Sequence, residues 1–231
     1  MRILTIYATP HKGNTRAITE IFLNNFKNEN NEFDEIVLPM DMPHLCLGCG
    51  NCIVKGEEYC PHHKAMEPVL DRIEKADLLV FSTPCFVNSC SSGLKALLDH
   101  LAYLFMVHRP KASMFDKVGM IITTAAGAGI KSTRKLIQSN LFYWGVPKTF
   151  NYGITCMKMG GNYSETKKKD KIIKAVNKKA KKVKKALKNP KPGFKTRFLF
   201  NIFKLTQKNP WNPVDGNYWK ESGWLDGKKP Y

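Results

Sequence analysis

The cysteines of the chain are concentrated in one short stretch. Four of the seven follow the pattern C-x2-C-x2-C-x7-C-P, at Cys46, Cys49, Cys52 and Cys60. Three cysteines at successive spacings of three let one loop wrap a corner of a cubane cluster, and a fourth completes the thiolate set of a 4Fe-4S centre. Zinc is the main competing metal, but structural zinc sites more often use two separated cysteine pairs. The spacing favours the cluster, with zinc or unligated cysteines as the alternatives.

Other residues with metal or redox chemistry are expected to be structural. His62 and His63 are adjacent to each other beside the cysteines, and we expect them to be ordinary loop residues. Cys90 lies near the start of a predicted helix, where a thiolate is favoured. We nevertheless expect Cys85, Cys90 and Cys156 to be small buried or half-buried side chains.

A second candidate site is the polar loop 9–15, which reads TPHKGNT. It follows an apolar strand and precedes a helix, so unpaired backbone N–H groups and the positive end of the helix dipole lie there and attract phosphate. Taken alone, the loop fits an ordinary capped turn as well, because it is neither a Walker loop nor a G-x-G-x-x-G fingerprint. Side-chain donors and positive charge come from Thr9, His11, Lys12, Asn14 and Thr15.

Apolar strands alternate with amphipathic helices along most of the chain. Strands are predicted at residues 2–8, 35–38, 78–82, 118–123 and 149–156, and helices at 15–26, 65–75, 91–106, 130–144 and 165–187. This alternation predicts an α/β fold with a doubly wound five-stranded parallel sheet in the order 2-1-3-4-5. The loops 9–15, 83–89 and 124–129 would then meet at the carboxyl edge of the sheet, where such folds bind ligands.

These three loops resemble those of the NADPH-dependent FMN reductase family of flavodoxin-like proteins. Residues 9–15 are similar to its S-P-R-x-x-G-N-T phosphate loop, with one residue fewer, and residues 83–89 (TPCFVNS) to its S-P-V-Y-F/W-x-S loop beside the flavin ring. Residues 92–100 resemble the helix that follows, and residues 124–129 take the place of the Gly-rich third loop. The resemblance covers about residues 1–160 and implies a flavodoxin-like fold, FMN as cofactor and NAD(P)H as co-substrate.

The resemblance also implies which residues hold FMN, with the phosphate at the first loop and the ring against the other two. The implied set is Thr9, His11, Lys12, Asn14, Thr15, Pro84, Cys85, Phe86, Val87, Asn88, Thr124, Ala125, Ala126 and Gly127. His11 replaces the usual arginine, and Cys85-Phe86 replaces Val-Tyr, which removes a phenolic hydroxyl near the ring. No residue is expected to act as a catalytic acid or base, because the cofactor carries the chemistry of hydride transfer.

The cysteine segment resembles that of the iron–sulfur flavoprotein branch of the family. That likeness implies that Cys46, Cys49, Cys52 and Cys60 hold a 4Fe-4S cluster near FMN, across a subunit contact in a homodimer or homotetramer. The implied function is an FMN-dependent oxidoreductase that passes electrons between NAD(P)H or ferredoxin and an unknown acceptor. The alternatives are a flavodoxin-like electron carrier without NAD(P)H activity and an FMN reductase whose cysteines bind no cluster.

Composition limits the partners. The chain has 231 residues, 43% of them hydrophobic, and a net charge of +18. Residues 167–191 are rich in lysine and predict a helix whose solvated basic face attracts NADPH or an acidic redox partner. A nucleic-acid-binding helix is disfavoured because interleaved aromatic residues and arginines are missing there. The apolar start of the chain is too short for a signal peptide or a membrane span, which predicts a cytoplasmic protein without a transmembrane segment.

The chain divides into a domain and an extension. Residues 1–188 are predicted to form the flavodoxin-like FMN-binding domain, with a cysteine-rich insertion at 44–64. Residues 189–231 form a basic, aromatic C-terminal extension, which we expect to be docked on the domain. Within it, residues 194–205 are predicted to be an amphipathic helix that packs on another subunit, covers the flavin or touches a membrane.

Overall fold

The computed structural model describes residues 1–156 and 169–231. Its centre is one five-stranded, all-parallel sheet in the predicted order β2-β1-β3-β4-β5. The two strands that follow β1 in this order, β3 and β4, are buried along almost their whole length, which explains their continuous apolar runs. The strands are β1 (Arg2–Tyr7), β2 (Glu32–Val37), β3 (Leu78–Pro84), β4 (Val118–Ala125) and β5 (Lys148–Thr155).

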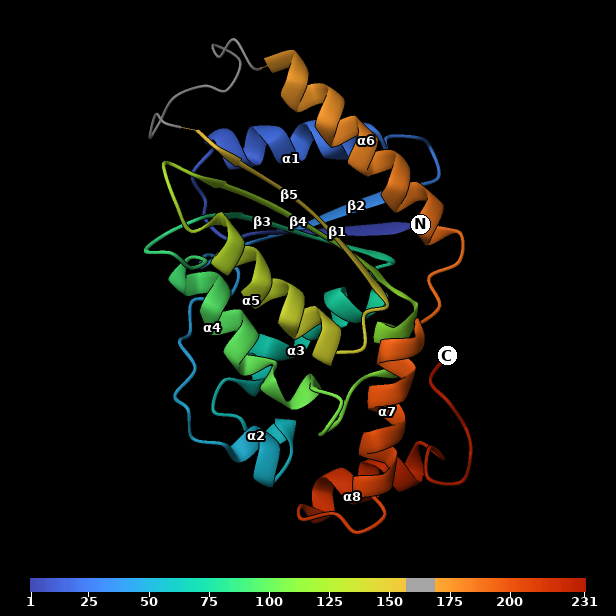
Figure 1. Ribbon diagram of the computed structural model, residues 1–231. Helices are drawn as coiled ribbons and strands as arrows, with labels where there is room; N and C mark the ends of the chain where they lie inside the picture. Colours follow the sequence, from blue (N-terminus) through green and yellow to red (C-terminus); the bar gives the residue numbers. More distant parts are fainter. Residues whose placement is uncertain (157–168) are drawn as a thin grey trace.

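Helices cover both faces of the sheet (Figure 1). Successive strand residues point to opposite faces, so Leu78 and Val80 join one core, whereas Leu79 and Phe81 join the other. The first core is closed by α1 (Asn14–Asn24) and α6 (Lys169–Leu187). The second is closed by α3 (His63–Lys75), α4 (Ser92–His100) and α5 (Ile130–Tyr143).

The lysine-rich helix α6 packs as its periodicity predicts. Ile172, Val176, Ala180 and Val183 are buried against the sheet beside α1, and most of the lysines between them are exposed. The basic charge of this helix is therefore a solvated face. Residues 165–168 of the predicted helix lie outside the described residues.

The predicted helix 91–106 is shorter than expected. α4 ends at His100, and a 3-10 turn, η2 (Ala102–Leu104), follows before the chain becomes extended at Phe105. The apolar residues beyond His100 serve two different cores, because Leu104 packs with α4 whereas Met106 packs with aromatic residues of the C-terminal extension. The backbone turns at this point and so supplies a side chain to each core.

The cysteine insertion contains little regular structure. It holds the single-turn helix α2 (Asn51–Val54) and the 3-10 turn η1 (Glu57–Tyr59), and it leads into α3 earlier than predicted. The expectation that the two histidines lie in a loop holds for His62 and is wrong for His63. His62 lies in the turn before α3 as its N-cap residue, and His63 is the first helical residue.

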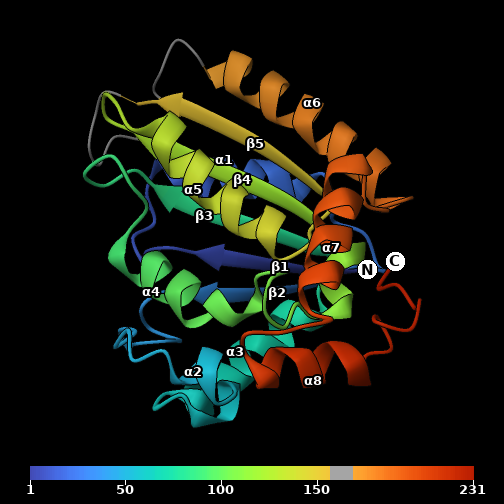
Figure 2. The same cartoon turned by 60° about the horizontal axis from the view of Figure 1, so that its bottom comes forward.

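The C-terminal extension packs on the rest of the chain. Its helices α7 (Phe194–Thr206) and α8 (Pro213–Glu221) enclose a third core with Phe115 of the 3-10 turn η3 (Ala112–Asp116). The aromatic residues of this core include Phe200, Trp219 and Trp224. Figure 2 shows α8 beside α2, on the side of the molecule that carries the cysteine insertion. No helix in the described part of the chain is long and apolar enough to cross a bilayer.

Candidate functional site

A pocket lies at the carboxyl edge of the sheet, where three loops meet. Its volume is about 280 Å³, close to the lower end of the range for small-molecule sites. The lining comes from the loops after β1, β3 and β4 and from the end of β5. It consists of Thr9, His11, Gly13, Asn14, Thr15, Pro84, Cys85, Phe86, Thr124, Ala125, Ala126 and Cys156.

Hydrogen bonds between the strand ends hold the pocket in one arrangement. The hydroxyls of Thr15 and Thr124 lie 2.6 Å apart. The N–H of Cys85 donates to the Thr124 carbonyl at 2.7 Å, and the N–H of Cys156 donates to the Ala125 carbonyl at 2.8 Å. Because these bonds join α1, β3 and β5 to the end of β4, the sheet itself fixes the walls of the pocket.

The amino end of α1 opens toward the pocket. Its N-cap residue, Gly13, provides no side-chain cap, and the first turn contains no acidic residue. The first-turn N–H groups and the positive end of the helix dipole are therefore available to an anion. A Cβ at Gly13 would lie 2.9 Å from the ring of His11, so glycine permits this close approach. The side-chain oxygen of Asn14 is buried and has no hydrogen-bond partner within the described chain.

The loop after β3 forms a tight hairpin beside the pocket. Phe86 and Ser89 exchange two backbone hydrogen bonds, both 2.8 Å long. The two central residues, Val87 and Asn88, have positive φ values of 46° and 59°. A β-branched residue is strained in that region, and Val87 is 98% exposed at the tip of the turn. The hairpin leaves Phe86 at the pocket, half-exposed.

The loop after β4 joins this hairpin at Gly129. Its φ of +94° favours glycine, and a Cβ there would lie 2.2 Å from Sγ of Cys85. The hydroxyl of Ser132, in the first turn of α5, donates to the carbonyls of Asn88 and Gly129. The loops after β3 and β4 therefore form one continuous wall of the pocket.

The structure brings together most of the residues predicted to hold FMN. Those that do not line the pocket are Lys12, Val87, Asn88 and Gly127, all of which are exposed. Gly13 and Cys156 line the pocket and were missing from the predicted set. Cys156 could have been found from the fold, because it follows β5 and all strands of a parallel sheet end at the same edge. Cys85 and Cys156 are half-buried and Cys90 is buried, as predicted.

The cysteine segment turns sharply between its thiols. Gly48 and Gly50, on either side of Cys49, have φ values of 64° and 70°, which favour glycine. The backbone N–H of Gly48 donates to Sγ of Cys46 at 3.5 Å. Hydrogen bonds of this kind to cysteine sulfur tune iron–sulfur clusters. All cysteines of the chain are free of disulfides.

The other three thiols of the motif act electrostatically on Cys52. Burial, followed by negative charge on Cys60, Cys46 and Cys49, raises the pKa of Cys52 to about 11, while the Arg109 guanidinium acts in the opposite direction. The Cys52 thiol is therefore protonated at neutral pH in the chain as described.

Arg109 fixes the cysteine segment to the C-terminal extension. Its side chain is 3% exposed, and Asp215 of α8, with which it forms an ion pair, is completely buried. The side chain of Asn212 also donates to the Ile53 carbonyl at 2.7 Å. The other partners of the guanidinium are the carbonyls of Cys52 and Ile53 and the carboxylate of Glu57. We call Arg109, Asn212 and Asp215 the brace.

The cysteine segment itself carries exposed apolar side chains. Leu45, Leu47, Val54 and Tyr59 are all more than half exposed. The segment meets the domain at the far end of α4 from the pocket, where His62 contacts His100. A helix of nine residues is about 13 Å long, so the two candidate sites are separated within one chain.

Comparison with known sequences points to one family. Residues 1–151 match the profile described as NADPH-dependent FMN reductase. A protein of Archaeoglobus fulgidus named iron-sulfur flavoprotein is 26% identical over 130 residues, which are 56% of this chain and 56% of that protein. A protein of the same name from Methanosarcina thermophila is 26% identical over 140 residues, or 60% of this chain and 70% of that protein. The chain therefore spans little more than half the length of the first relative.

Solved structures share the fold. An FMN-dependent NADH-azoreductase from Bacillus anthracis, in complex with FMN, superimposes with a TM-score of 0.62 at 14% identity, covering 79% of this chain and 98% of that one. An NAD(P)H:quinone oxidoreductase from Methanothermobacter marburgensis gives 0.61 at 16% identity, covering 82% and 98%. Similarity at this level of identity establishes the flavodoxin-like fold. The sequence profile covers well over half of the chain, and on that basis the chain belongs to the NADPH-dependent FMN reductase family.

Proposed function

We propose that the chain is an FMN-dependent oxidoreductase that takes electrons from NAD(P)H. The observation that carries this proposal is the convergence of three loops on one pocket that opens onto the amino end of α1. In a doubly wound sheet, this edge is where a phosphate-bearing ligand binds. The family match and the two relatives named iron-sulfur flavoprotein support the same proposal.

The residues of the pocket fit FMN. None of the described lining residues is acidic, so nothing there repels a phosphate, and His11 adds a side chain that can carry positive charge. The buried side-chain oxygen of Asn14 is an acceptor without a donor, and a hydroxyl or N–H group of bound FMN would supply one. Pro84 and Phe86 offer a flat apolar surface for an aromatic ring.

FMN, when bound, supplies the hydride and electron chemistry at its ring. The chain positions it: the end of α1 holds the phosphate, and the wall formed by the second and third loops orients the ring. The hydrogen bond between Thr15 and Thr124 keeps the phosphate side and the ring side of the pocket at a fixed separation. No acid or base of the protein is required in this scheme.

We further propose that Cys46, Cys49, Cys52 and Cys60 hold a 4Fe-4S cluster, which would transfer single electrons. The left-handed glycines, the N–H to sulfur hydrogen bond and the electrostatic effect of the other three thiols on Cys52 support this assignment.

The exposed apolar groups beside both sites support a homodimer or homotetramer. Leu45 and Leu47 lie beside the cysteines, and Phe86 and Val87 lie beside the pocket. The separation of the two sites within one chain, by the length of α4, is compatible with electron transfer across a subunit contact. The positive net charge would attract NADPH or an acidic ferredoxin as the donor.

Anaerobic purification followed by a visible spectrum, iron and sulfide analysis and titration with NADPH tests these proposals. We expect FMN absorption bands that bleach with NADPH or NADH. We also expect about four iron and four sulfide ions per chain, the content of one 4Fe-4S centre. Protein that lacks flavin even after incubation with FMN would refute the proposal that the chain is an FMN-dependent oxidoreductase. Flavin that is reduced by ferredoxin but not by NAD(P)H would show an electron carrier instead, and flavin without iron or sulfide would refute the cluster alone.

A further inference from the structure

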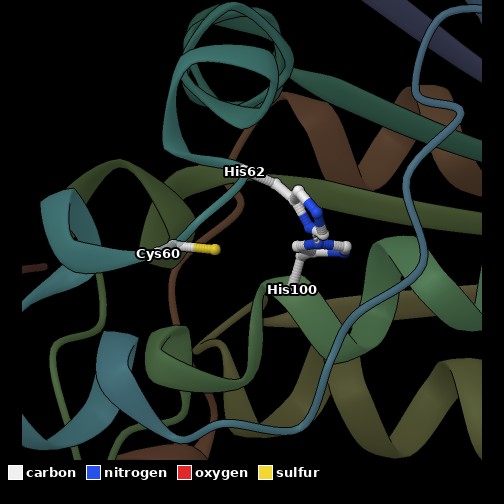
Figure 3. A group of neighbouring side chains, drawn as sticks. All are labelled: Cys60, His62 and His100. Atoms are coloured by element: carbon white, nitrogen blue, oxygen red, sulfur yellow. Dashed lines mark hydrogen bonds between the residues drawn. The ribbon is translucent and has the colours of Figure 1, made fainter.

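Cys60, His62 and His100 form a compact group at the junction of the cysteine segment and α4. The metal-binding atoms of the three side chains lie within 4.8 Å of one another. Figure 3 shows Cys60 on the turn before α3, with its sulfur directed toward the two histidine rings. The group brings together one thiol and two imidazoles from segments that are about forty residues apart in the chain.

The hydrogen bonds of His100 prepare its ring for a metal. Its Nδ1 lies 2.8 Å from the carbonyl oxygen of Ala96, and because a carbonyl only accepts, Nδ1 carries the proton. The lone pair is then on Nε2, which lies 2.9 Å from Nδ1 of His62. A ring nitrogen that donates to a backbone carbonyl while the other faces a ligand is the usual arrangement of metal-binding histidines. The ring is also 3% exposed, so its orientation is fixed.

His62 is held in place on its other side. The ring of His44 stacks on it with a centroid separation of 4.6 Å and an interplanar angle of 12°. Without a metal, Nδ1 of His62 donates its proton to Nε2 of His100. If the proton moves to Nε2 of His62, both imidazoles offer a lone pair, and the metal-binding atoms of the three residues lie within 4.8 Å of one another.

We propose that Cys60, His62 and His100 bind one zinc ion, and that zinc competes with the iron–sulfur cluster for the Cys60 thiolate. One thiolate and two imidazoles are a ligand set that zinc accepts, and three protein ligands leave a fourth position for water or a small ligand. Zinc replaces the proton of the Cys60 thiol, which is released as one proton per ion, and binds the imidazoles through their lone pairs. The zinc site stands without the cluster, but the competition rests on the cluster assignment made under Proposed function.

Metal titration of the full-length, reduced, metal-free protein tests the site. Co²⁺ serves as the spectroscopic probe, followed by displacement with Zn²⁺. We expect one Co²⁺ per chain, a thiolate-to-cobalt charge-transfer band, and release of one proton per ion. His62→Asn and His100→Asn should each weaken zinc binding roughly 100-fold or more, because loss of an outer hydrogen-bond partner already costs about 10–100-fold. Retained far-UV circular dichroism verifies that each variant is folded.

Two matched variants separate this site from the other cysteines and histidines. His63→Asn changes the adjacent histidine, which is outside the group, and should leave zinc affinity within about twofold. Cys46→Ala removes a cluster ligand and should also leave zinc affinity unchanged, whereas Cys60→Ala should abolish it. Cobalt binding that survives both histidine variants but is lost in Cys46→Ala would overturn the proposal in favour of a four-cysteine zinc site. Absence of cobalt binding in the unchanged chain would also overturn it.

Reconstitution with iron and sulfide tests the competition. Added Zn²⁺ should lower the cluster content of the unchanged chain and have much less effect on His100→Asn, which keeps all four cysteines. Unchanged chains that hold zinc and a full cluster together would overturn the competition. If no variant forms a cluster while the Co²⁺ site titrates as expected, the cluster proposal and the competition fail and the zinc site is supported.

Discussion

The pocket and the cysteine segment are built in opposite ways. The pocket is made by the ends of parallel strands, and short hydrogen bonds between Thr15 and Thr124 and between Cys85 and Thr124 fix its walls. The cysteine segment has only one turn of α-helix and several exposed apolar side chains. It is held by Arg109 and by residues of the C-terminal extension.

This difference shows where each site obtains its rigidity. The pocket is organised by the sheet, so its geometry is present wherever the fold is present. The cysteine segment depends on contacts between residues far apart in the sequence, and it lacks a core of its own. Changes in the brace should therefore disturb the proposed metal site and spare the proposed flavin site, and changes in the pocket loops should do the reverse.

Arg109→Met should have the largest effect. It removes the guanidinium from the buried carboxylate of Asp215, which keeps only its contact with His108, and it removes a donor from the Cys52 carbonyl; breaking a buried pair in this way costs about 3–5 kcal/mol. Denaturant unfolding measures this loss, and iron content should fall more than FMN content. Arg72→Met, which removes a more exposed arginine paired with Asp34, is the control and should cost about 1 kcal/mol or less. Equal losses of FMN and iron would contradict the comparison.

The free energy of unfolding of the metal-free, reduced protein should depend on pH through the raised pKa of Cys52. Its pKa is raised from 9.0 to about 11, with burial as the main cause. The folded chain thus keeps this proton where the unfolded chain loses it, so the stabilisation is complete below pH 9 and is lost as the pH rises to about 11. Allowing for screening of a half-buried group, the loss is about 1–2 kcal/mol. Cys52→Ala should lack this part of the pH dependence in denaturant unfolding, and an identical profile would contradict it.

Thr15→Val should act on the pocket alone. It removes the hydrogen bond to Thr124 and leaves a buried hydroxyl unpaired, at a cost of about 1–2 kcal/mol. We expect FMN affinity to fall about tenfold or more by fluorescence titration, with iron content unchanged. Thr206→Val, in α7, alters a threonine whose hydroxyl only contacts its own helix and serves as the control.

Val87→Asn should cause the smallest change in stability, and it should stabilise the chain where the other substitutions destabilise it. Asparagine tolerates the positive φ of this position better than valine, and the exposed valine side chain contributes little packing. We expect a stabilisation of about 0.5–1 kcal/mol by thermal unfolding. Loss of stability would show that the tip of the hairpin makes contacts absent from the single chain, such as those of a subunit interface.

The sequence predicts the sheet and the pocket well because both depend on local patterns. Apolar runs ending in Thr, Pro or Gly mark the strand ends, and the parallel order brings those ends together. Gly13 and Cys156 were missed because their contribution depends on backbone position. The end of α4 at His100 was also missed. Leu101 and Leu104 continue the helical spacing of apolar residues, although the chain turns after His100 and places side chains in two different cores.

The contacts of the cysteine segment could not be predicted. Arg109 and Asp215 are separated by 106 residues, and nothing in the pattern around either residue identifies its partner. His62 and His100 are 38 residues apart, and each reads as an ordinary residue of its own element. Such pairs follow only from the packed structure, so a sequence motif can identify metal ligands without showing what orients them.

The brace also has a consequence for biosynthesis. Asn212, which holds the Ile53 carbonyl, comes 159 residues later in the chain. At about 5–20 residues per second, the ribosome needs roughly 8–30 s to add them. The cysteines therefore emerge long before the residues that orient them have been made. If the proposed metal binds these cysteines, the residues that orient its ligands are complete only after translation has passed α8.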